Sequence, residues 1–520
     1  MRNLPSFVAE ALPLPQRRSS EREAVPLQVL FALAAMLATS AAEPGYERFD
    51  IISAATATDS RDKNWKPGKG LVLEVSGMCW IGPDRLGVAI RKGEIWFIDG
   101  VLGNDPKAIK YQLFASGLQE PLGLLPDGDG YLVVQRTEMT RLRDTNGDDV
   151  ADEYLTAARG WSVTGAYHGY AYGPERDGAG NLWVTLNLDM GDRSDNDKGW
   201  RGWALIADKS GSLRPQAAGL RSPCGMGMNL AGDMFVTDQQ GTWVPATPIH
   251  HLRSGAFYTN PEGIASQELP GSPLKLSREV PRDVSYPEAV RALPEMAPAA
   301  VWLPYNKMGR SATDIQVIDA GGKFGPFDGQ LLVGEFTNSA INRVFLEKID
   351  GAYQGACFPF LTGFPSAVVR LSFAPDGSLF VGMTNRGWSS LGTRSYGLQR
   401  VRWDGKSSFA IREMRAKPDG FELVFTEPVD PASAANPASW TMDSFTYLYS
   451  SAYGSEEIDP KSLVIPSAEV SADGRTVRLR VEGLRELYVH ELHAPGVKST
   501  AGQALADPRA FYTLNRIPKL

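Results

Sequence analysis

One short pattern recurs along this chain and limits its possible folds more than any other feature. An apolar strand is followed by a turn rich in Pro, Asp and Gly, and then by a second strand with alternating polarity. The six occurrences are Met78–Ile90, Leu122–Val134, Tyr170–Leu186, Gly227–Asp238, Phe324–Glu335 and Leu371–Met383. Asp-Gly and similar turns supply the positive φ angles that tight hairpins need. The pattern therefore predicts an all-β fold, a six-bladed β-propeller, because closure into a ring protects the strand edges that an open sheet exposes.

Composition supports this interpretation and excludes several classes of protein. The 520 residues exceed what one ordinary core holds, so we expect a large domain and a smaller one. With 53 glycines, 36 prolines and 43% hydrophobic residues, the chain favours short strands joined by turns over disorder. The net charge of −7 gives no reason to expect nucleic acid as a partner. The three cysteines form no Cys-x-x-Cys pair, which argues against zinc ribbons, c-type haem and a disulfide framework.

The N-terminus has the composition of a secretory signal. The apolar run Val25–Ala42 follows Arg17, Arg18 and Arg22 and ends in small residues. This order predicts a signal peptide over residues 1–42, and hence a periplasmic or secreted protein with no membrane span after signal removal. An uncleaved anchor is the alternative, although the run is short for a bilayer span.

The remaining chain divides by composition into three parts. We expect an N-terminal linker at 43–69, the propeller at 70–410, and a small β-sandwich at 411–520. A stretch rich in Pro and charged residues, Ser266–Ala300, is interpreted as a loop inserted into the propeller. In the last part, the run FTEPVDPASAANPASW resembles a bacterial immunoglobulin-like module, and such modules usually support or space another domain.

Oxygen-bearing residues recur at the spacing of a calcium-binding loop. The expected metal ligands are Asp144, Asn146, Asp148, the carbonyl of Val150, and Asp152. Calcium prefers six to eight oxygen ligands from a tightly wound segment, which this spacing can supply. Leu155 stands where an EF-hand has its glutamate, so Glu153 or a neighbouring loop would have to complete the shell. The alternative is an acidic turn exposed to solvent.

Histidine is scarce in this chain, and one of the five histidines lies where a propeller binds small molecules. His168 comes just before a predicted inner strand, and the start of such a strand faces the central channel. A histidine there can abstract a proton from a hydroxyl group or pair with a carboxylate. The alternative is a hydrogen-bonded histidine packed among Tyr167, Tyr170 and Tyr172. Tryptophans also permit two interpretations, stacking on sugar faces or packing between blades, at positions 183, 200, 203 and 243.

Three longer segments resemble a known enzyme family. HGYAYGPERDGAGNLWVTLNLDMGD, AGLRSPCGMGMNLAGDMFVTDQQG and HHLRSGAFYTNP are similar to the soluble PQQ-dependent glucose/aldose sugar dehydrogenases. The chain also resembles exported propeller proteins of planctomycete-type bacteria that are labelled membrane-bound dehydrogenases. The resemblance implies a six-bladed propeller with a calcium-assisted quinone cofactor. It aligns His168 with the family's catalytic base, Arg221 with an arginine that binds the cofactor carboxylates, and Gln239 and Gln240 with a loop that offers oxygens to calcium.

The sequence also departs from the family pattern at positions that contact the cofactor. Ser222 and Cys224 replace two residues of the family's Arg-Asn-Pro-Gln segment, and two amide side chains are lost. The family's cofactor lysine has no counterpart in the strand that ends near Thr337, and its paired arginines are reduced to Arg370 at a shifted register. PQQ is a tricarboxylate and needs cationic and amide partners, so these losses bear directly on the cofactor.

Three functions from different classes follow from these observations. The first is an exported sugar-acting oxidoreductase with a small carbohydrate substrate, in which His168 takes the proton of a sugar hydroxyl. Since the chain has no haem motif, the electron acceptor would be a separate partner. The second is a quinone-free, calcium-dependent sugar lyase or lactonase that uses His168 as base. The third is a non-catalytic propeller that binds carbohydrate or protein.

Overall fold

The recurrent strand-and-turn units form antiparallel hairpins in the computed structural model of the chain. The structure describes residues 45–51, 72–103, 105–163, 165–190, 196 and 199–519. The predicted signal peptide and most of the predicted linker lie outside these residues. The described residues belong to one compact unit.

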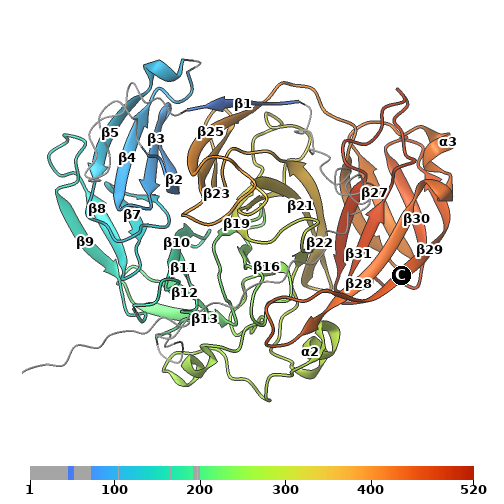
Figure 1. Cartoon of the computed structure of the whole chain (residues 1–520), viewed down its shortest axis with the longest axis horizontal. Helices are drawn as coiled ribbons and strands as arrows, with labels where there is room; N and C mark the ends of the chain where they lie inside the picture. The colour runs from blue at the N-terminus through green and yellow to red at the C-terminus, as the bar shows by residue number, and fades with distance from the viewer. Residues whose placement is uncertain are drawn as a thin grey trace, which may run out of the picture. The chain divides into compact units, whose positions relative to one another are not determined.

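The first three sheets each contain four antiparallel strands in sequence order (Figure 1). The first holds β2 (Val75–Gly82), β3 (Arg85–Ile90), β4 (Glu94–Asp99) and β5 (Lys110–Ala115), with the 3-10 turn η1 (Pro106–Ala108) before β5. The second holds β6 (Leu125–Asp127), β7 (Gly130–Val134), β8 (Met139–Arg143) and β9 (Glu153–Ala158). The third holds β10 (Ala171–Arg176), β11 (Leu182–Leu186), β12 (Trp203–Ala207) and β13 (Leu213–Ala218).

The fourth sheet carries the predicted insertion between its third and fourth strands. Its strands are β14 (Met226–Met228), β15 (Met234–Thr237), β16 (Thr247–His251) and β18 (Val301–Leu303). The insertion contains η2 (Ile264–Glu268), β17 (Val284–Ser285) and α2 (Tyr286–Ala292). Ser285 and Glu288 form a reciprocal capping box that satisfies the first amides of α2. The insertion is therefore an ordered element and not a plain loop.

The last sheet of the ring is closed by a strand from the N-terminus. It contains β23 (Val368–Phe373), β24 (Leu379–Thr384), β25 (Tyr396–Trp403) and β1 (Tyr46–Asp50). β1 pairs with β25 in antiparallel register, from Tyr46 opposite Trp403 to Asp50 opposite Gln399. The segment predicted as a linker thus includes the outer strand of this sheet.

The fifth group of four strands is not a separate sheet. It holds β19 (Ala312–Val317), β20 (Leu331–Glu335), β21 (Ala340–Ile349) and β22 (Ala352–Leu361). β22 also pairs with β32, so the group continues into a twelve-stranded sheet. The all-β propeller class predicted from the sequence is confirmed. The expected count of six blades is not exact, because only five groups are separate four-stranded sheets.

The innermost strands follow one another around a central channel. β6 contacts β2, β2 contacts β23, β23 contacts β19, β19 contacts β14, and β14 contacts β10. β10 also contacts β7 of the second sheet, next to β6. Glycines permit this approach: a Cβ at Gly77 would lie 2.5 Å from the carbonyl carbon of Gly123, and one at Gly123 would lie 2.1 Å from the carbonyl oxygen of Gly173. The backbones of three neighbouring inner strands therefore meet where larger side chains would not fit.

The sheets pack through apolar side chains on both of their faces. In β4, Trp96 belongs to a core shared with the last sheet, through residues such as Phe380. The adjacent Phe97 belongs to a core shared with the second sheet, through residues such as Val133. Successive strand residues point to opposite faces. β4 is therefore apolar on both of its faces and packs against a neighbouring sheet on each side.

The C-terminal unit is built from seven strands and two short helical turns. Its elements are β26 (Ile411–Lys417), β27 (Gly420–Phe425), α3 (Pro431–Ala434), η3 (Pro437–Ser439), β28 (Thr441–Tyr449), β29 (Glu457–Val470), β30 (Thr476–Glu482), β31 (Tyr488–His493) and β32 (Arg509–Leu514). The long strand β29 pairs with β28 over its first half and with β30 over its second half. A separate apolar core lies between these strands and includes Phe421, Leu479 and Tyr512. The resemblance of this unit to an immunoglobulin-like module stays a prediction. Within the described residues, no helix combines the length and apolar character needed to cross a bilayer.

Candidate functional site

A cavity of about 480 Å³ lies at the end of the channel where the inner strands begin. Most of its lining comes from segments before β10, β14 and β19 and from loops after β11, β15, β20 and β24, and the rest from β10, β23 and the loop after β28. Six of the lining residues are His168, Arg221, Gln239, Thr337, Arg386 and Trp388. This volume lies within the range of small-molecule sites. The structure therefore brings the predicted His168 and Arg221 to the same cavity.

His168 is half-buried and its backbone is held from two sides. The side-chain amide of Asn187 donates to the His168 carbonyl at 2.9 Å. The guanidinium of Arg136 donates to the carbonyls of Ala166 and Tyr167, at 2.5 and 3.1 Å. No residue in the described part of the chain hydrogen-bonds the imidazole nitrogens, and the ring lies 5.8 Å from that of Trp388. The ring also lies 5.2 Å from that of Tyr167 and 6.4 Å from that of Tyr170, so His168 packs against tyrosines and lines the cavity at the same time.

The surroundings of His168 disfavour its charged form. Partial burial lowers the pKa of the imidazole below its usual value, and the positive charges of Arg221, Arg386 and Arg136 lower it further. The carboxylate of Asp189 acts in the opposite direction and is the weakest of these influences. The imidazole is therefore neutral near pH 7 and able to accept a proton.

Arg221 is buried beside His168 without a carboxylate partner among the described residues. It is 8% exposed, and its Nη1 lies 3.4 Å from both the Ser222 hydroxyl and the Gln240 carbonyl. Its Nε has no hydrogen-bond partner in this part of the chain. A Cβ at Gly241 would lie only 2.0 Å from this Nε, so the glycine makes room for the guanidinium. Arg221 thus presents a guanidinium to the cavity without a direct carboxylate contact among the described residues, although its charge acts on the carboxyl groups of Asp238 and Glu262 outside the lining.

Asp238 fixes the backbone at Arg221 and Ser222. Its carboxylate accepts hydrogen bonds from the backbone amides of Arg221 and Ser222 at 2.7 and 2.6 Å. Burial raises the pKa of Asp238 to about 6, against the lowering influence of these amides and of Arg221. The carboxylate itself does not line the cavity.

A second arginine of the cavity is anchored by a carboxylate that lies behind the lining. Arg386 pairs with Glu120 at 2.7 Å, and its guanidinium lies 4.1 Å from the centre of the Tyr170 ring. Glu120 is shared with Arg136 at 3.3 Å and with Arg91 at 3.7 Å. No Asp or Glu lines the cavity among the described residues. The electrostatics of this site therefore favour an anionic ligand.

The remaining residues expected to contact a cofactor divide into two groups. Gln239, Ser222, Cys224 and Thr337 line the cavity. Gln240 does not line it, and its side-chain amide donates to the Pro245 carbonyl at 3.1 Å. Of the two glutamines that were expected to offer oxygens to calcium, only Gln239 lies where it could contact a ligand in this cavity.

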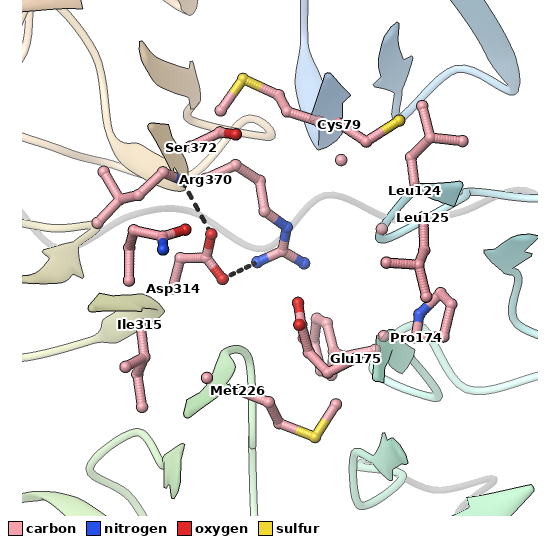
Figure 2. Close-up of a pocket in the computed structure, with 18 of the residues that line it drawn as sticks. Cys79, Leu124, Leu125, Pro174, Glu175, Met226, Asp314, Ile315, Arg370 and Ser372 are labelled. Atoms are coloured by element: carbon pink, nitrogen blue, oxygen red, sulfur yellow. Dashed lines mark hydrogen bonds and ion pairs between the residues drawn. The ribbon is translucent and has the colours of Figure 1, made fainter. Parts of the chain in front are cut away.

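A second cavity of about 300 Å³ lies at the other end of the channel and shares Tyr172 and Cys224 with the first (Figure 2). Arg370 lies between Asp314 and Glu175 in this cavity, and its Nη1 is 3.7 Å from the Asp314 carboxylate. Burial and the charge of Asp314 raise the pKa of Glu175 to about 8, although Arg370 lowers it.

Arg370 also donates to backbone carbonyls of several inner segments. The acceptors are Ser76, Leu122, Cys224 and its own neighbour Val369, at 2.9 to 3.3 Å. The guanidinium of this residue therefore connects inner strands around the channel and does not line the cavity that holds His168.

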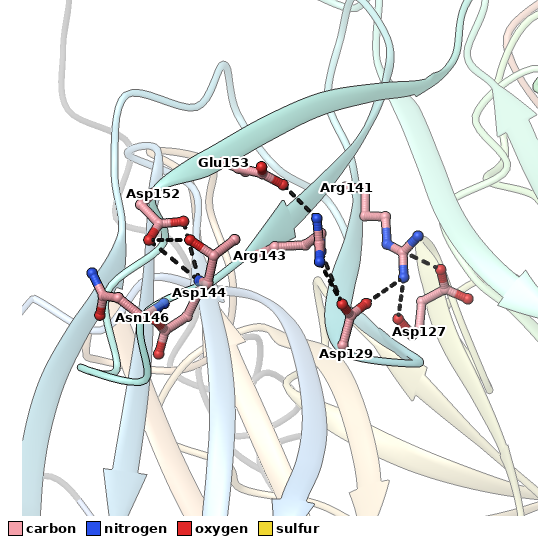
Figure 3. Close-up of polar contacts among 9 residues, drawn as sticks. Asp127, Asp129, Arg141, Arg143, Asp144, Asn146, Asp152 and Glu153 are labelled. Carbon is pink, nitrogen blue, oxygen red and sulfur yellow. Dashed lines mark hydrogen bonds and ion pairs between the residues drawn. The ribbon is translucent and has the colours of Figure 1, made fainter.

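The predicted calcium loop lies between β8 and β9, at the outer edge of the second sheet (Figure 3). The Asp144 carboxylate accepts hydrogen bonds from four backbone amides of the loop, those of Asn146, Gly147, Asp148 and Asp149. The amide and hydroxyl of Thr145 donate to Asp152. Glu153, which the sequence offered as a further metal ligand, pairs with Arg143 at 2.6 Å.

The predicted metal ligands are therefore held largely by hydrogen bonds inside their own loop. The side-chain oxygen of Asn146 accepts a hydrogen bond from the backbone amide of Asp148, and the Asp148 carboxylate accepts one from the amide of Val150. Among the described residues, no cluster of three or more His, Cys, Asp or Glu side chains could hold a metal ion. Calcium binding by Asp144, Asn146, Asp148, Val150 and Asp152 stays a prediction.

Two aromatic residues of the cavity were not singled out from the sequence. Trp388 and Tyr453 are 51% and 68% exposed, and both line the cavity. The tryptophans that had been considered for sugar stacking are instead buried in the cores between sheets, at positions 183, 200, 203 and 243. Trp388 had a usable signal, because it lies in a Gly- and Ser-rich segment just after the last predicted strand. No local sequence feature marks Tyr453 as a cavity residue, since it lies in the C-terminal unit, far from the propeller in sequence.

The fold and the cavity define a β-propeller with a polar, cationic site at one end of its channel. The chain belongs to the family described as Domain of unknown function (DUF7133), whose profile matches residues 102–383, more than half of the chain. No curated protein matches the chain.

Solved structures similar to this chain include PQQ-dependent dehydrogenases. The PQQ-bound aldose sugar dehydrogenase of Streptomyces coelicolor is 13% identical, with a TM-score of 0.45, over 70% of this chain and 99% of that one. The PQQ domain of pyranose dehydrogenase from Coprinopsis cinerea is 11% identical, with a TM-score of 0.46, over 69% and 96%. The apo soluble aldose sugar dehydrogenase of Escherichia coli is 11% identical, with a TM-score of 0.44, over 68% and 99%.

Proposed function

We propose that this protein is an exported sugar-acting oxidoreductase whose active site is the cavity that contains His168 and Arg221. One observation carries the proposal: an imidazole with a lowered pKa and a buried arginine without a carboxylate partner line the same cavity. A neutral base beside a fixed positive charge is suited to removing a proton from a hydroxyl group and stabilising the negative charge that develops.

The residues present fit a carboxylate-bearing quinone such as PQQ in charge. The cavity lining among the described residues is free of Asp and Glu, and the buried Nε of Arg221 is without a partner there. Arg221 would hold a carboxylate, and Gln239 would offer an amide, while Ser222 and Cys224 contribute smaller groups than the family pattern has. When bound, such a quinone supplies the acceptor for the hydride of the sugar.

The chain's own residues then have distinct parts in the reaction. His168 accepts the hydroxyl proton at an unprotonated imidazole nitrogen, and Asn187 and Arg136 hold the loop that carries it. Arg221 keeps the imidazole neutral before the reaction and favours negative charge at the reacting oxygen. The sheltered position of these groups in the channel strengthens both effects relative to water.

The partners of the reaction are part of the same proposal. The substrate is a small carbohydrate, and a separate electron acceptor receives the electrons. The signal segment predicted at 1–42 supports a reaction in the periplasm or outside the cell. Calcium is proposed as an accessory ion at the Asp144–Glu153 loop, because the described lining beside Gln239 has no carboxylate to hold a cation.

Reconstitution of the purified protein with PQQ tests the proposal directly. The protein is incubated with PQQ, with added calcium or with a chelator, and aldose-dependent reduction of an artificial dye is measured. His168→Ala is expected to lower turnover about a hundredfold or more, as expected for loss of a general base, without changing the melting temperature. His493→Ala removes an exposed histidine of β31 and serves as the matched control.

Other outcomes of the same experiment would contradict the proposal in recognisable ways. Turnover of a sugar or lactone without any quinone would point to the lyase or lactonase class. Sugar binding without turnover under any condition would point to a non-catalytic binding propeller. Equal turnover by His168→Ala and the unsubstituted protein would exclude His168 as the base.

A further inference from the structure

A loop of the C-terminal unit reaches the cavity of the propeller. This loop, residues 450–456, joins β28 to β29, and its Tyr453 lines the cavity together with residues of the propeller. The Arg221 guanidinium carbon lies 5.3 Å from the centre of the Tyr453 ring. The C-terminal unit was expected to act as a support or spacer, and it instead contributes a side chain beside the cationic residue of the site.

Backbone hydrogen bonds fix this loop to the propeller. Tyr453 forms a β-bridge with Thr242. The amide of Gly454 donates to the Gly241 carbonyl at 3.0 Å, and that of Ser455 donates to the Pro245 carbonyl at 2.8 Å. These bonds join the loop to the segment that follows β15, which also carries Gln239. The Tyr453 backbone is thus held in place before any ligand binds.

The fit between the two loops is close. Gly454 has a φ of +69°, and a Cβ there would lie 2.5 Å from the Gln240 side-chain amide. Gln240 therefore occupies the space that a larger residue would need.

A second anchor holds the strand that leads into the loop. β17 of the propeller insertion pairs with the end of β28, with Val284 opposite Tyr449 and Ser285 opposite Leu448. The Tyr449 hydroxyl also donates to the Thr259 carbonyl. The insertion and the C-terminal unit together therefore position the base of the Tyr453 loop.

The exposure of Tyr453 contrasts with this ordered backbone. Its side chain is 68% exposed, although the amides of the next two residues, Gly454 and Ser455, are bonded to the propeller. The other highly exposed aromatic side chain of the lining, Trp388, is 51% exposed and comes from the loop after β24. Exposed aromatic rings next to charged side chains are typical of a ligand-binding site, where the flat face of a ligand packs against the ring.

We propose that Tyr453 is a ligand-positioning residue, and that the C-terminal unit completes the binding site for a ring-shaped ligand that bears a carboxylate. The carboxylate of the ligand pairs with Arg221, and the ring of the ligand lies against Tyr453. This inference rests on the proposed function, because the same chemistry can come from the quinone cofactor or from an acidic sugar. Both sources share a ring and a carboxylate, so they are separate arms of the test.

Calorimetric titration of the full chain with PQQ, and separately with D-glucuronate, tests the inference without a turnover measurement. Tyr453→Ala is expected to weaken binding of at least one of the two probes about tenfold or more. Tyr453→Phe keeps the ring and is expected to bind within about threefold of the unsubstituted protein. Tyr154→Ala removes an exposed tyrosine of β9 outside the cavity, and it is the matched control.

The outcomes separate this inference from the proposed function. Unchanged binding of both probes by Tyr453→Ala would overturn the role of Tyr453 and leave the proposed function standing. Failure of the unsubstituted protein to bind either probe would overturn both. If Tyr453→Ala lowers the melting temperature, Tyr453→Leu, which keeps bulk but has no ring, replaces it in the comparison. The probe whose affinity falls identifies whether the cofactor or the sugar lies on the tyrosine.

Discussion

At the scale of single residues, the protonation of His168 is set mostly by its surroundings. Burial and the charges of Arg221, Arg386 and Arg136 all lower the pKa of the imidazole. A general base must be unprotonated, so kcat/KM rises with pH through the pKa of this group. We expect the acid limb of the kcat/KM profile to have its midpoint below the usual histidine value of 6.5. The pH dependence of dye reduction measures this midpoint.

Removal of one of these charges should move the midpoint in a known direction. Arg221→Gln removes a positive charge that opposes protonation, so the midpoint is expected to shift upward towards 6.5. Arg214→Gln, an exposed change on β13, is the control and should leave the midpoint in place. A downward shift in Arg221→Gln would show that His168 is not the titrating base. The readout is the position of the midpoint, which a general loss of activity does not change.

At the scale of the elements, one buried arginine connects the inner strands around the channel. Arg370 on β23 donates to the carbonyls of Ser76, Leu122 and Cys224, which belong to or precede inner strands of three other sheets. Arg370→Met would leave these carbonyls and the carboxylate of Asp314 without their buried cation. We expect it to lower the free energy of unfolding by about 3–5 kcal/mol, measured by chemical denaturation.

A surface arginine provides the comparison for this change. Arg394 is 60% exposed at its side chain and pairs with Asp50 at 3.2 Å. Arg394→Met is expected to cost less than about 1 kcal/mol, because exposed ion pairs contribute little. The double variant Arg370→Met with Asp314→Asn should recover part of the loss, since it removes the unpaired carboxylate. Equal effects of the two single methionine variants would contradict the role assigned to Arg370.

At the scale of the whole molecule, buried histidines link stability to pH. His250 in the fourth sheet and His490 in the C-terminal unit are fully buried, and burial lowers the pKa of each to about 3. In the unfolded chain these groups bind a proton near pH 6.5, whereas in the folded chain they do not. Each therefore lowers stability as the pH falls from about 6.5 towards 3, by about 1.4 kcal/mol per pH unit.

A substitution isolates this contribution from the other titrating groups. His250 stacks on Tyr258 with ring centres 4.3 Å apart, so His250→Phe keeps an aromatic contact and removes the proton site. Between pH 6 and 4 the free energy of unfolding should fall less steeply in His250→Phe than in the unsubstituted protein. The comparison is needed because Asp238, whose pKa is raised to about 6, acts in the opposite sense. Parallel curves would contradict the prediction.

Local sequence patterns predicted most of the inner hairpins. Tyr170–Leu186 covers β10 and β11. Met78–Ile90 covers β3 and all but the first three residues of β2, and Leu371–Met383 covers the second half of β23 and all but the last residue of β24. Phe324–Glu335 covers only β20, because the inner strand β19 lies earlier and is separated from it by a long turn. Hairpins with tight turns are recognisable since their turn residues and alternation lie within one short window.

Strand pairings between distant segments could not be predicted in this way. β1 pairs with β25, β17 with β28, and β22 with β32, each across a large separation in sequence. An edge strand carries no local mark of its partner, because its hydrogen bonds are made by backbone groups that every residue has. The predicted linker and the predicted separate blades differ from the structure for this reason.

The same distinction holds for the candidate site. The sequence by itself determined the all-β class and most of the inner strands, because turn chemistry can be recognised locally. It also pointed to His168 through the scarcity of histidine, and to Arg221 only through the resemblance to a known family. Only the tertiary structure decided that both residues share one cavity with Trp388 and Tyr453, that Gln240 faces the C-terminal loop, and that Arg370 connects inner strands. These facts depend on which strands pair to close the propeller and on which side chains become buried. Both depend on contacts between parts of the chain that are distant in sequence.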